Sequence, residues 1–257
     1  LCLVVGLSLQ IAVNFANDYS DGIKGTDLDR VGPTRLVASG MASADEVKKA
    51  ALTFFVIGGL AGYLLATRTS YWFIAIGAAA IISAWRYTGG KNPYGYAALG
   101  ELSVFIFFGL IATVGTTLIQ VKGFWQNDLL LVVTFAGATA IGLFSSAVLM
   151  VNNIRDIDTD RHVSKKTLAV KVGKRWAKAI YFLFIWLPIV LLAPFPFFYP
   201  ATFLAYASLL LILPATLIVA TAKQPKELIL ALKLTSFAAL VYSLALAFGL
   251  ASISVWV

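Results

Sequence analysis

Long apolar segments recur along the whole chain, and this feature constrains the fold more than any other. A helix that crosses a membrane needs about 20 mostly apolar residues. Because lipid offers the backbone no hydrogen bonds, such segments fold as helices that satisfy their own amide groups. The sequence therefore predicts an all-α membrane protein, a multi-helix transmembrane bundle in one domain over residues 1–257. We expect eight spans, at roughly 1–20, 47–67, 71–88, 102–121, 129–153, 176–197, 199–221 and 232–256.

Composition supports the membrane assignment and excludes several other classes of protein. Hydrophobic residues make up 60% of the chain and charged residues only 12%, against roughly a quarter charged in soluble domains. The lone cysteine, Cys2, excludes a disulfide framework, and the lone histidine, His162, argues against a zinc site. The net charge is +8, but the basic residues separate apolar spans and form no basic domain. This distribution excludes nucleic-acid binding.

The basic residues also predict the topology. Of the 20 lysines and arginines, only Arg68 and Lys122 fall outside the segments that follow or flank the first, third, fifth and seventh expected spans. Cytoplasmic loops retain positive charge, so we expect these segments on the cytoplasmic side of the cell membrane. The loops near 22–46, 89–101 and 154–175 would form a cytoplasmic cap. Leu1 would then lie outside, which predicts a further helix upstream that starts in the cytoplasm.

Four polar side chains lie on one face of the first expected span. Asn14, Asn17, Asp18 and Asp21 follow i, i+3, i+4, i+7 spacing. An aspartate at mid-membrane costs about 2.5–3.5 kcal/mol on insertion scales. These side chains therefore need partners or an aqueous cavity, and we expect them towards the cytoplasmic end. The alternative is a helix end that simply emerges into water.

A second acidic cluster ends the fifth expected span. Asn152, Asp156 and Asp160 are spaced i, i+4, i+8 and are expected on one face, whereas Asp158 points elsewhere if the helix continues. The pattern Asn17-x-x-x-Asp21 recurs as Asn152-x-x-x-Asp156. This weak internal repeat suggests two halves whose acidic helix ends face one another.

The chemistry of both clusters points to a metal and an anionic ligand. Carboxylate and amide oxygens suit Mg²⁺, which takes one or two carboxylates and leaves positions for water and phosphate. Cationic side chains lie beside both clusters, and carboxylates, metal and cations together form a diphosphate site. These cations could instead serve topology alone. They are Arg30 and Arg35 beside the first cluster, and Arg155, Arg161, Lys165 and Lys166 beside the second.

The motifs resemble those of the UbiA superfamily of intramembrane prenyltransferases. Its Asn-x-x-x-Asp-x-x-x-Asp and Asp-x-x-x-Asp signatures match Asn17 and Asp21, and Asp156 and Asp160; its Tyr-x-x-x-Lys motif matches Tyr87 and Lys91. Gly25 stands where a third aspartate is usual, and the next acid is Asp27. With this departure, the first motif resembles the form found in the 1,4-dihydroxy-2-naphthoate polyprenyltransferase branch of the superfamily. The segments Gly32-Pro33-Thr34-Arg35, 93–101 and 152–170 also resemble that branch. Such proteins have nine membrane helices, so the first would precede this sequence.

The resemblance implies a reaction and a set of site residues. A polyprenyl group would pass from its diphosphate to 1,4-dihydroxy-2-naphthoate with loss of the carboxylate, giving demethylmenaquinol in menaquinone biosynthesis. Mg²⁺ would be the cofactor, and polyprenyl diphosphate, 1,4-dihydroxy-2-naphthoate and membrane lipid the partners, at a site open to the cytoplasm. Asp18, Asp21, Asp156 and Asp160 would be catalytic, and together with Asn17 would hold the metal. The expected substrate contacts are Asn14, Asp27, Arg35, Tyr87, Lys91, Asn152, Asn153, Arg155 and Lys165.

Two alternatives stay open at this point. Another UbiA-type transferase would act on 4-hydroxybenzoate, homogentisate or a glyceryl phosphate. A magnesium or anion transporter would also carry membrane carboxylates and a repeat. A transporter should expose polar residues through the bilayer and at both mouths, whereas the polar residues here collect at one side.

Overall fold

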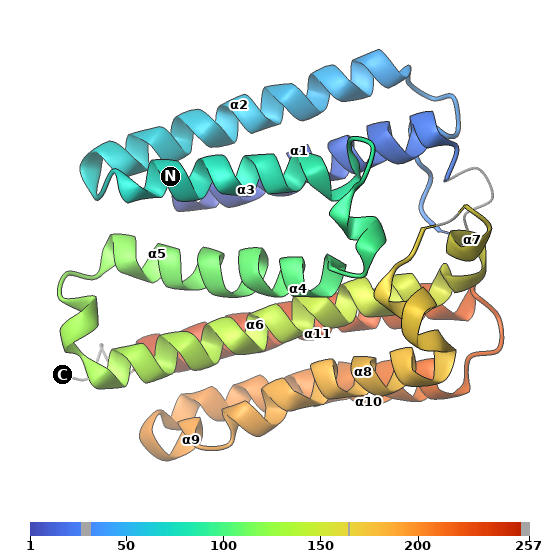
Figure 1. Ribbon diagram of the computed structural model, residues 1–257. Coiled ribbons are helices and arrows are strands. Elements are labelled where there is room, and N and C mark those ends of the chain that lie inside the picture. The colour runs from blue at the N-terminus through green and yellow to red at the C-terminus, as the bar shows by residue number, and fades with distance from the viewer. Residues whose placement is uncertain (27–31, 164, 253–257) are drawn as a thin grey trace. The chain divides into compact units, whose positions relative to one another are not determined.

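The computed structural model describes residues 1–26, 32–163 and 165–252, and the described chain consists of helices joined by turns and short loops (Figure 1). Its contacts divide it into two compact units. Unit 1 comprises Leu1–Gly100, Leu118–Lys122 and Thr159–Thr167. Unit 2 comprises Glu101–Thr117, Gly123–Asp158 and Leu168–Val257. Both units lie within the segment that the sequence predicts to be one domain.

Unit 1 contains three long helices and a short 3₁₀ turn: α1 (Cys2–Lys24), α2 (Ala44–Arg68), α3 (Trp72–Thr88) and η1 (Tyr94–Ala97). α1 ends at Gly25, whose φ of 70° lies in the left-handed region that favours glycine. α2 begins with a capping box between Ser43 and Glu46. Small residues let α1 and α2 approach closely, since a Cβ added to Gly58 would lie 3.3 Å from the Ser8 Cβ.

Unit 2 is built around α6 (Asp128–Arg155), which packs against α8, α11 and η2. Phe144, Met150, Tyr181, Ile185 and Tyr242 are fully buried in its core. The other elements are α4 (Gly100–Val104), η2 (Phe105–Ile111), α5 (Ala112–Gln120), η3 (Phe124–Gln126), α8 (Leu168–Leu192), α9 (Phe195–Phe198), η4 (Pro200–Ser208), α10 (Leu209–Thr221) and α11 (Glu227–Ala251). A further short helix, α7 (Ile157–His162), begins in unit 2 and ends in unit 1.

The segment η2 is a stretch of π-helix that joins α4 to α5. Such stretches are rare and occur often at functional sites. Gly109 in η2 packs directly against α6, because a Cβ added there would lie 2.5 Å from the Gly142 Cα. This close approach holds α4 against α6, where Ser146 Oγ donates a hydrogen bond of 3.0 Å to the Glu101 carbonyl oxygen.

Within the described residues, each of the eight expected spans falls mainly on helix. Among the described residues, six helices are long and apolar enough to cross a membrane, instead of the eight expected. The two that fall short are α3, which has only 17 residues, and α1, whose second half carries the polar cluster from Asn14 to Asp21. The six are Ala44–Arg68, Gly100–Gln120, Asp128–Arg155, Leu168–Phe198, Pro200–Thr221 and Glu227–Ala251. The prediction of an all-α, multi-helix membrane bundle is confirmed.

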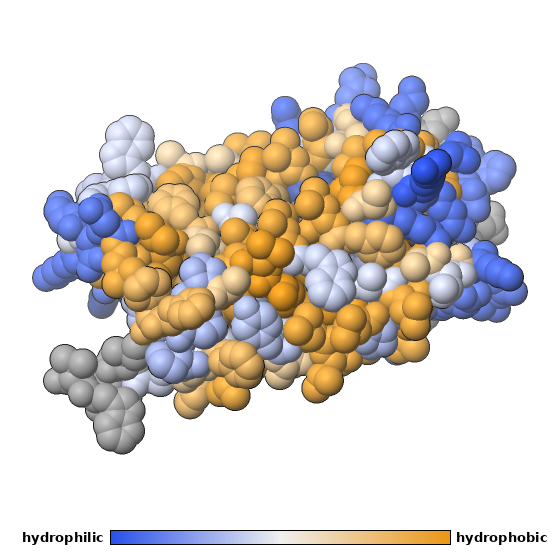
Figure 2. Space-filling view, turned by 90° about the horizontal axis from the view of Figure 1, so that it is seen from below, coloured by the Kyte–Doolittle hydropathy of each residue, from blue (hydrophilic) through white to orange (hydrophobic). Residues whose placement is uncertain are grey.

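Apolar side chains cover the outer surface of the helices. Leu183, Val190, Leu210 and Leu217 are each more than half exposed on α8 and α10. Figure 2 shows hydrophobic residues gathered over the middle of the face on which these helices lie. Contiguous exposed apolar surface of this kind is unfavourable in water and favourable in lipid. The surface therefore agrees with a multi-pass membrane protein.

Candidate active site

Asp21, at the end of α1, is held by two other segments of unit 1. Its side chain is buried, with 3% exposure. The Tyr96 hydroxyl donates a hydrogen bond of 2.6 Å to Asp21 Oδ1. The Lys165 Nζ lies 3.6 Å from Asp21 Oδ2. A buried carboxylate is stable only with such partners, because an unpaired charge away from water is costly.

The same lysine reaches Asp160, which belongs to the second predicted motif. Lys165 Nζ lies 3.9 Å from Asp160 Oδ1. Thr167 Oγ1 donates a hydrogen bond of 3.5 Å to Asp160 Oδ2. The Lys165 backbone amide also donates to the Asp160 carbonyl oxygen at 2.9 Å. One ammonium group therefore lies between carboxylates of the two motifs, within unit 1.

The Tyr96 ring connects further cationic residues to this group. The ammonium nitrogens of Lys24 and Lys165 lie 4.9 and 5.1 Å from the ring centroid, within the range of cation–π attraction. Lys24 also donates to the Thr88 carbonyl oxygen, and Thr88 Oγ1 donates to Asn17 Oδ1 at 2.8 Å. Sequence reasoning missed Tyr96, Thr88 and Thr167, because no helical spacing connects them to the acidic motifs. It also missed Lys24, although Lys24 lies at i+3 from Asp21 on the same helix and this spacing could have indicated it.

The polar face of α1 is divided among different partners. Asp18 is buried and accepts hydrogen bonds from the backbone amides of Leu36 and Val37, at 2.9 and 3.2 Å. It thereby anchors the segment that carries Arg35. Asn14 is exposed and donates to the Gln10 carbonyl oxygen of the preceding turn. The helical spacing alone did not distinguish these environments.

In unit 2, Arg155 and Asp156 form a buried bidentate pair. Arg155 Nε lies 2.6 Å from Asp156 Oδ1 and Nη2 lies 2.7 Å from Oδ2, while Nη2 also donates to Asn152 Oδ1 at 2.8 Å. The arginine is only 4% exposed, and its Nη1 has no hydrogen-bond partner among the described residues. A buried guanidinium N–H in this state suits an anionic oxygen.

The prediction that Asn152, Asp156 and Asp160 share one continuous helix face is wrong. α6 ends at Arg155, the backbone at Asp156 has φ −94° and ψ 9°, and α7 begins at Ile157. Adjacent side chains of a regular helix do not face each other, so the Arg155–Asp156 pair forms where the backbone leaves the helix. Asp158 is exposed and Asp160 is 6% exposed, so these two acids do lie in different environments, as expected.

Glu101 is a second buried carboxylate that the sequence reasoning left without a role. It begins the helical segment α4–η2–α5 and is 3% exposed. Asn153 Nδ2 donates a hydrogen bond of 2.8 Å to Glu101 Oε1. A signal for it exists in the sequence, since Glu101 ends the segment 93–101 that contributes to the family resemblance.

The other expected contacts are dispersed. The Tyr87 ring meets the Tyr94 ring edge to face, with centroids 5.5 Å apart. Lys91 is exposed and Arg35 is half-buried. Asp27, like Arg30, lies outside the described residues. Within the described part of the chain, no three Asp, Glu, His or Cys side chains form a group that could hold a metal by themselves.

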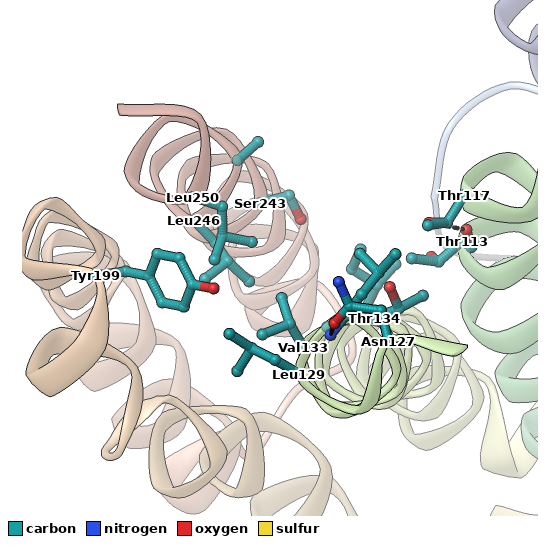
Figure 3. A pocket seen from close by; sticks show the side chains of 14 residues that line it. Thr113, Thr117, Asn127, Leu129, Val133, Thr134, Tyr199, Ser243, Leu246 and Leu250 are labelled. Atoms are coloured by element: carbon teal, nitrogen blue, oxygen red, sulfur yellow. Dashed lines mark hydrogen bonds between the residues drawn. The ribbon is translucent and has the colours of Figure 1, made fainter. Parts of the chain in front are cut away.

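A cavity of about 470 Å³ lies in unit 2 at the N-terminal end of α6. Figure 3 shows Tyr199 pointing between α6 and α11, with Thr113 and Thr117 of α5 on the other side of α6. Leucine, isoleucine, valine, alanine and glycine supply most of the lining, and Thr134 and Ser243 add hydroxyl groups. Pockets of this composition bind largely apolar ligands. Arg155 lies at the other end of α6, which at 1.5 Å per residue is about 42 Å long.

Helices long and apolar enough to cross a membrane, together with buried carboxylates paired with cations, define a multi-pass membrane protein with a buried polar site. The chain matches the UbiA prenyltransferase family over residues 1–237. It is 44% identical to the 1,4-dihydroxy-2-naphthoate octaprenyltransferase of Mycobacterium tuberculosis, over 98% of this chain and 84% of that protein. The proteins of the same name from Mycobacterium leprae and Escherichia coli are 45% and 38% identical, over 70% and 68% of this chain and 60% and 57% of theirs. The chain therefore belongs to the UbiA prenyltransferase family and is an enzyme of the prenyl-transferring class.

Proposed function

We propose that the protein transfers a polyprenyl group from its diphosphate to 1,4-dihydroxy-2-naphthoate, with loss of carbon dioxide, in menaquinone biosynthesis. The names of the relatives support this choice of acceptor. The structural observation that carries the proposal is the position of Lys165 Nζ between the carboxylates of Asp21 and Asp160. This arrangement of carboxylates around a cation suits a diphosphate bound together with a metal.

The donor set fits Mg²⁺. Asp21 and Asp160 present hard oxygen atoms on either side of one cation, and Mg²⁺ typically takes one or two carboxylates and completes its shell with water and substrate phosphate. We propose these two residues as its main ligands. When bound, the ion would neutralise negative charge on the diphosphate. The Tyr96 hydroxyl keeps the Asp21 carboxylate in place through its 2.6 Å hydrogen bond.

The basic side chains act on the leaving diphosphate. Lys24 and Lys165 place two positive charges beside Asp21, and Arg155 holds a buried N–H for an anionic oxygen. Interactions that strengthen as charge develops on the leaving group accelerate the reaction. The other residues expected from the sequence stay in the proposal as metal or substrate contacts: Asn14, Asn17, Asp18, Asp27, Arg35, Tyr87, Lys91, Asn152, Asn153 and Asp156.

The apolar helices bind the polyprenyl tail of the donor. Each CH₂ group of a prenyl tail gains about 0.8 kcal/mol on leaving water, and water must be kept from the allylic cation until the acceptor attacks. We propose that the cavity of Figure 3 receives the far end of the tail, because it is mostly apolar and lies at the end of α6 away from Arg155.

A competition assay tests the function. The purified protein, in detergent with Mg²⁺, is incubated with octaprenyl diphosphate and equal concentrations of 1,4-dihydroxy-2-naphthoate, 4-hydroxybenzoate and homogentisate. We expect prenylated product from the naphthoate alone, and none when the metal is chelated. A product formed mainly from another acceptor would contradict the proposed substrate. Ion flux through vesicles without any prenylated product would favour a transporter.

A further inference from the structure

Glu101 is a buried carboxylate with one oxygen atom that no described residue satisfies. Oε1 accepts the hydrogen bond from Asn153, but Oε2 has no hydrogen-bond partner among the described residues, although the residue is only 3% exposed. Leaving a buried polar atom unsatisfied costs about 1–3 kcal/mol, and more for a charged group. Buried polar atoms in this state call for an explanation, such as a ligand or a catalytic role.

The surroundings of Glu101 hold it in one position. Ser146 of α6 binds its carbonyl oxygen and Asn153 of α6 binds its carboxylate. The contact between Gly109 and Gly142 fixes the same pair of segments two turns further along. No cation lies within ion-pair distance of the carboxylate among the described residues. A carboxyl oxygen that is fixed, desolvated and without a cation suits the acceptance of a proton, because desolvation disfavours the charged form.

We propose that Glu101 is the general base that takes the proton from a hydroxyl group of the aromatic acceptor. This inference rests on the proposed function, which supplies an acceptor with a hydroxyl group beside its carboxylate. Oε2 is the oxygen atom that receives the proton, while Oε1 accepts the hydrogen bond from Asn153. Asn153, expected from the sequence as a substrate contact, thereby orients the base.

The step balances in atoms and electrons. The acceptor O–H bond breaks, its proton moves to Glu101 Oε2 and its electron pair stays on the oxygen. The ring carbon that carries the carboxylate forms a bond to the first carbon of the prenyl group, whose bond to the diphosphate oxygen breaks with the electron pair leaving on the diphosphate. The carboxylate departs as carbon dioxide and returns its bonding pair to the ring. Glu101 then gives the proton back to the ring oxygen.

The test compares Glu101→Gln with Leu102→Ala. The glutamine can still accept the Asn153 hydrogen bond but cannot take a proton, so transfer at neutral pH should fall about 100-fold or more. It should recover as the pH rises and the acceptor ionises by itself. Binding of the donor diphosphate should stay within a few-fold of the wild type in both variants. Leu102→Ala changes the neighbouring residue, which is 56% exposed, and should transfer at nearly the wild-type rate.

Several outcomes would overturn the proposal. If the Glu101→Gln variant keeps more than about a tenth of the wild-type transfer rate, Glu101 has only a structural role. The same conclusion follows if its rate is reduced by the same factor at every pH. Should Glu101→Gln fail to fold, Glu101→Asp decides: it keeps a carboxylate, so its rate should follow the wild-type pH dependence at a lower level, and any other dependence contradicts the proposal. If instead the wild type fails to prenylate the hydroxynaphthoate, the proposed function itself is wrong.

Discussion

Asp158 and Asp160 are acidic residues separated by a single residue, yet one is exposed and the other is buried. Asp158 is exposed to its surroundings, whereas Asp160 is buried beside Thr167 and close to Lys165. Their separation does not depend on a regular helix, because the backbone leaves the helical conformation at Asp156. Only Asp160 contributes to the arrangement of carboxylates around Lys165, so the two positions should tolerate substitution very differently.

At this scale we predict that Asp160→Asn lowers Mg²⁺-dependent prenyl transfer by about 100-fold or more, the usual effect of removing one well-placed electrostatic group. Asp158→Asn should keep the rate within a few-fold of the wild type. Initial rates are measured at saturating metal and donor, after thermal unfolding shows that both variants fold. Equal large losses would mean that Asp158 also faces the site, and equal mild losses would mean that both acids only solvate the end of a helix.

At the scale of single elements, α6 carries different functions at its two ends. Its C-terminal end holds Asn152, Asn153 and Arg155, and its N-terminal part lines the cavity through Val133 and Thr134. Thr134 is 7% exposed and faces the cavity, whereas Val132, two residues earlier, is 65% exposed on another side of the same helix. This contrast offers a matched pair of substitutions for the proposed binding of the prenyl tail.

We predict that Thr134→Phe fills part of the cavity and raises the KM for long prenyl diphosphates by about 10-fold or more, the effect of losing about 1.4 kcal/mol of binding. The KM for a short donor such as geranyl diphosphate should stay unchanged, because its tail does not extend to this end of α6. Val132→Phe should change neither value. An equal rise for short and long donors would place the tail elsewhere.

At the scale of the whole molecule, the distribution of basic residues supports one orientation in the membrane. Lys24, Lys91 and Lys165 follow or flank expected spans on the side that carries nearly all positive charge, whereas Arg68 and Lys122 stand apart. The positive-inside rule places the charged side in the cytoplasm. We therefore propose that the active site opens to the cytoplasm, where a charged diphosphate and a carboxylate-bearing acceptor are soluble.

Labelling of single cysteines tests this orientation in a Cys2→Ser background. Ser39, Asn92, Lys166 and Gln224 are exposed, and cysteines at these positions should react with a membrane-impermeant thiol reagent only from the cytoplasmic side. Cysteines that replace the exposed residues Thr69 and Gln126 should react only from outside. Reaction of any two of the first four from outside would refute the proposed orientation.

The sequence by itself determined the class of structure and predicted the location of the chemistry. Apolar segments of membrane-spanning length permit only a few folds in lipid, because each must satisfy its backbone hydrogen bonds internally. Helical spacing then brought Asp18 and Asp21 to one end of α1, and the resemblance to a known family identified both acidic motifs. The prediction of a helical membrane bundle is confirmed because it depends on neighbouring residues and on the solvent, which local sequence describes well; the site at the two motifs stays a prediction.

Only the tertiary structure decided which of these side chains meet. Asp21 and Asp160 are far apart in the chain, and their common contact with Lys165 depends on how α1 and the segment after α6 pack. Tyr96 reaches Asp21 from a short turn, and Glu101 reaches Asn153 across two helices held together at Gly109. Periodicity within one helix carries no information about such contacts, because they are fixed by packing between segments that are far apart along the chain.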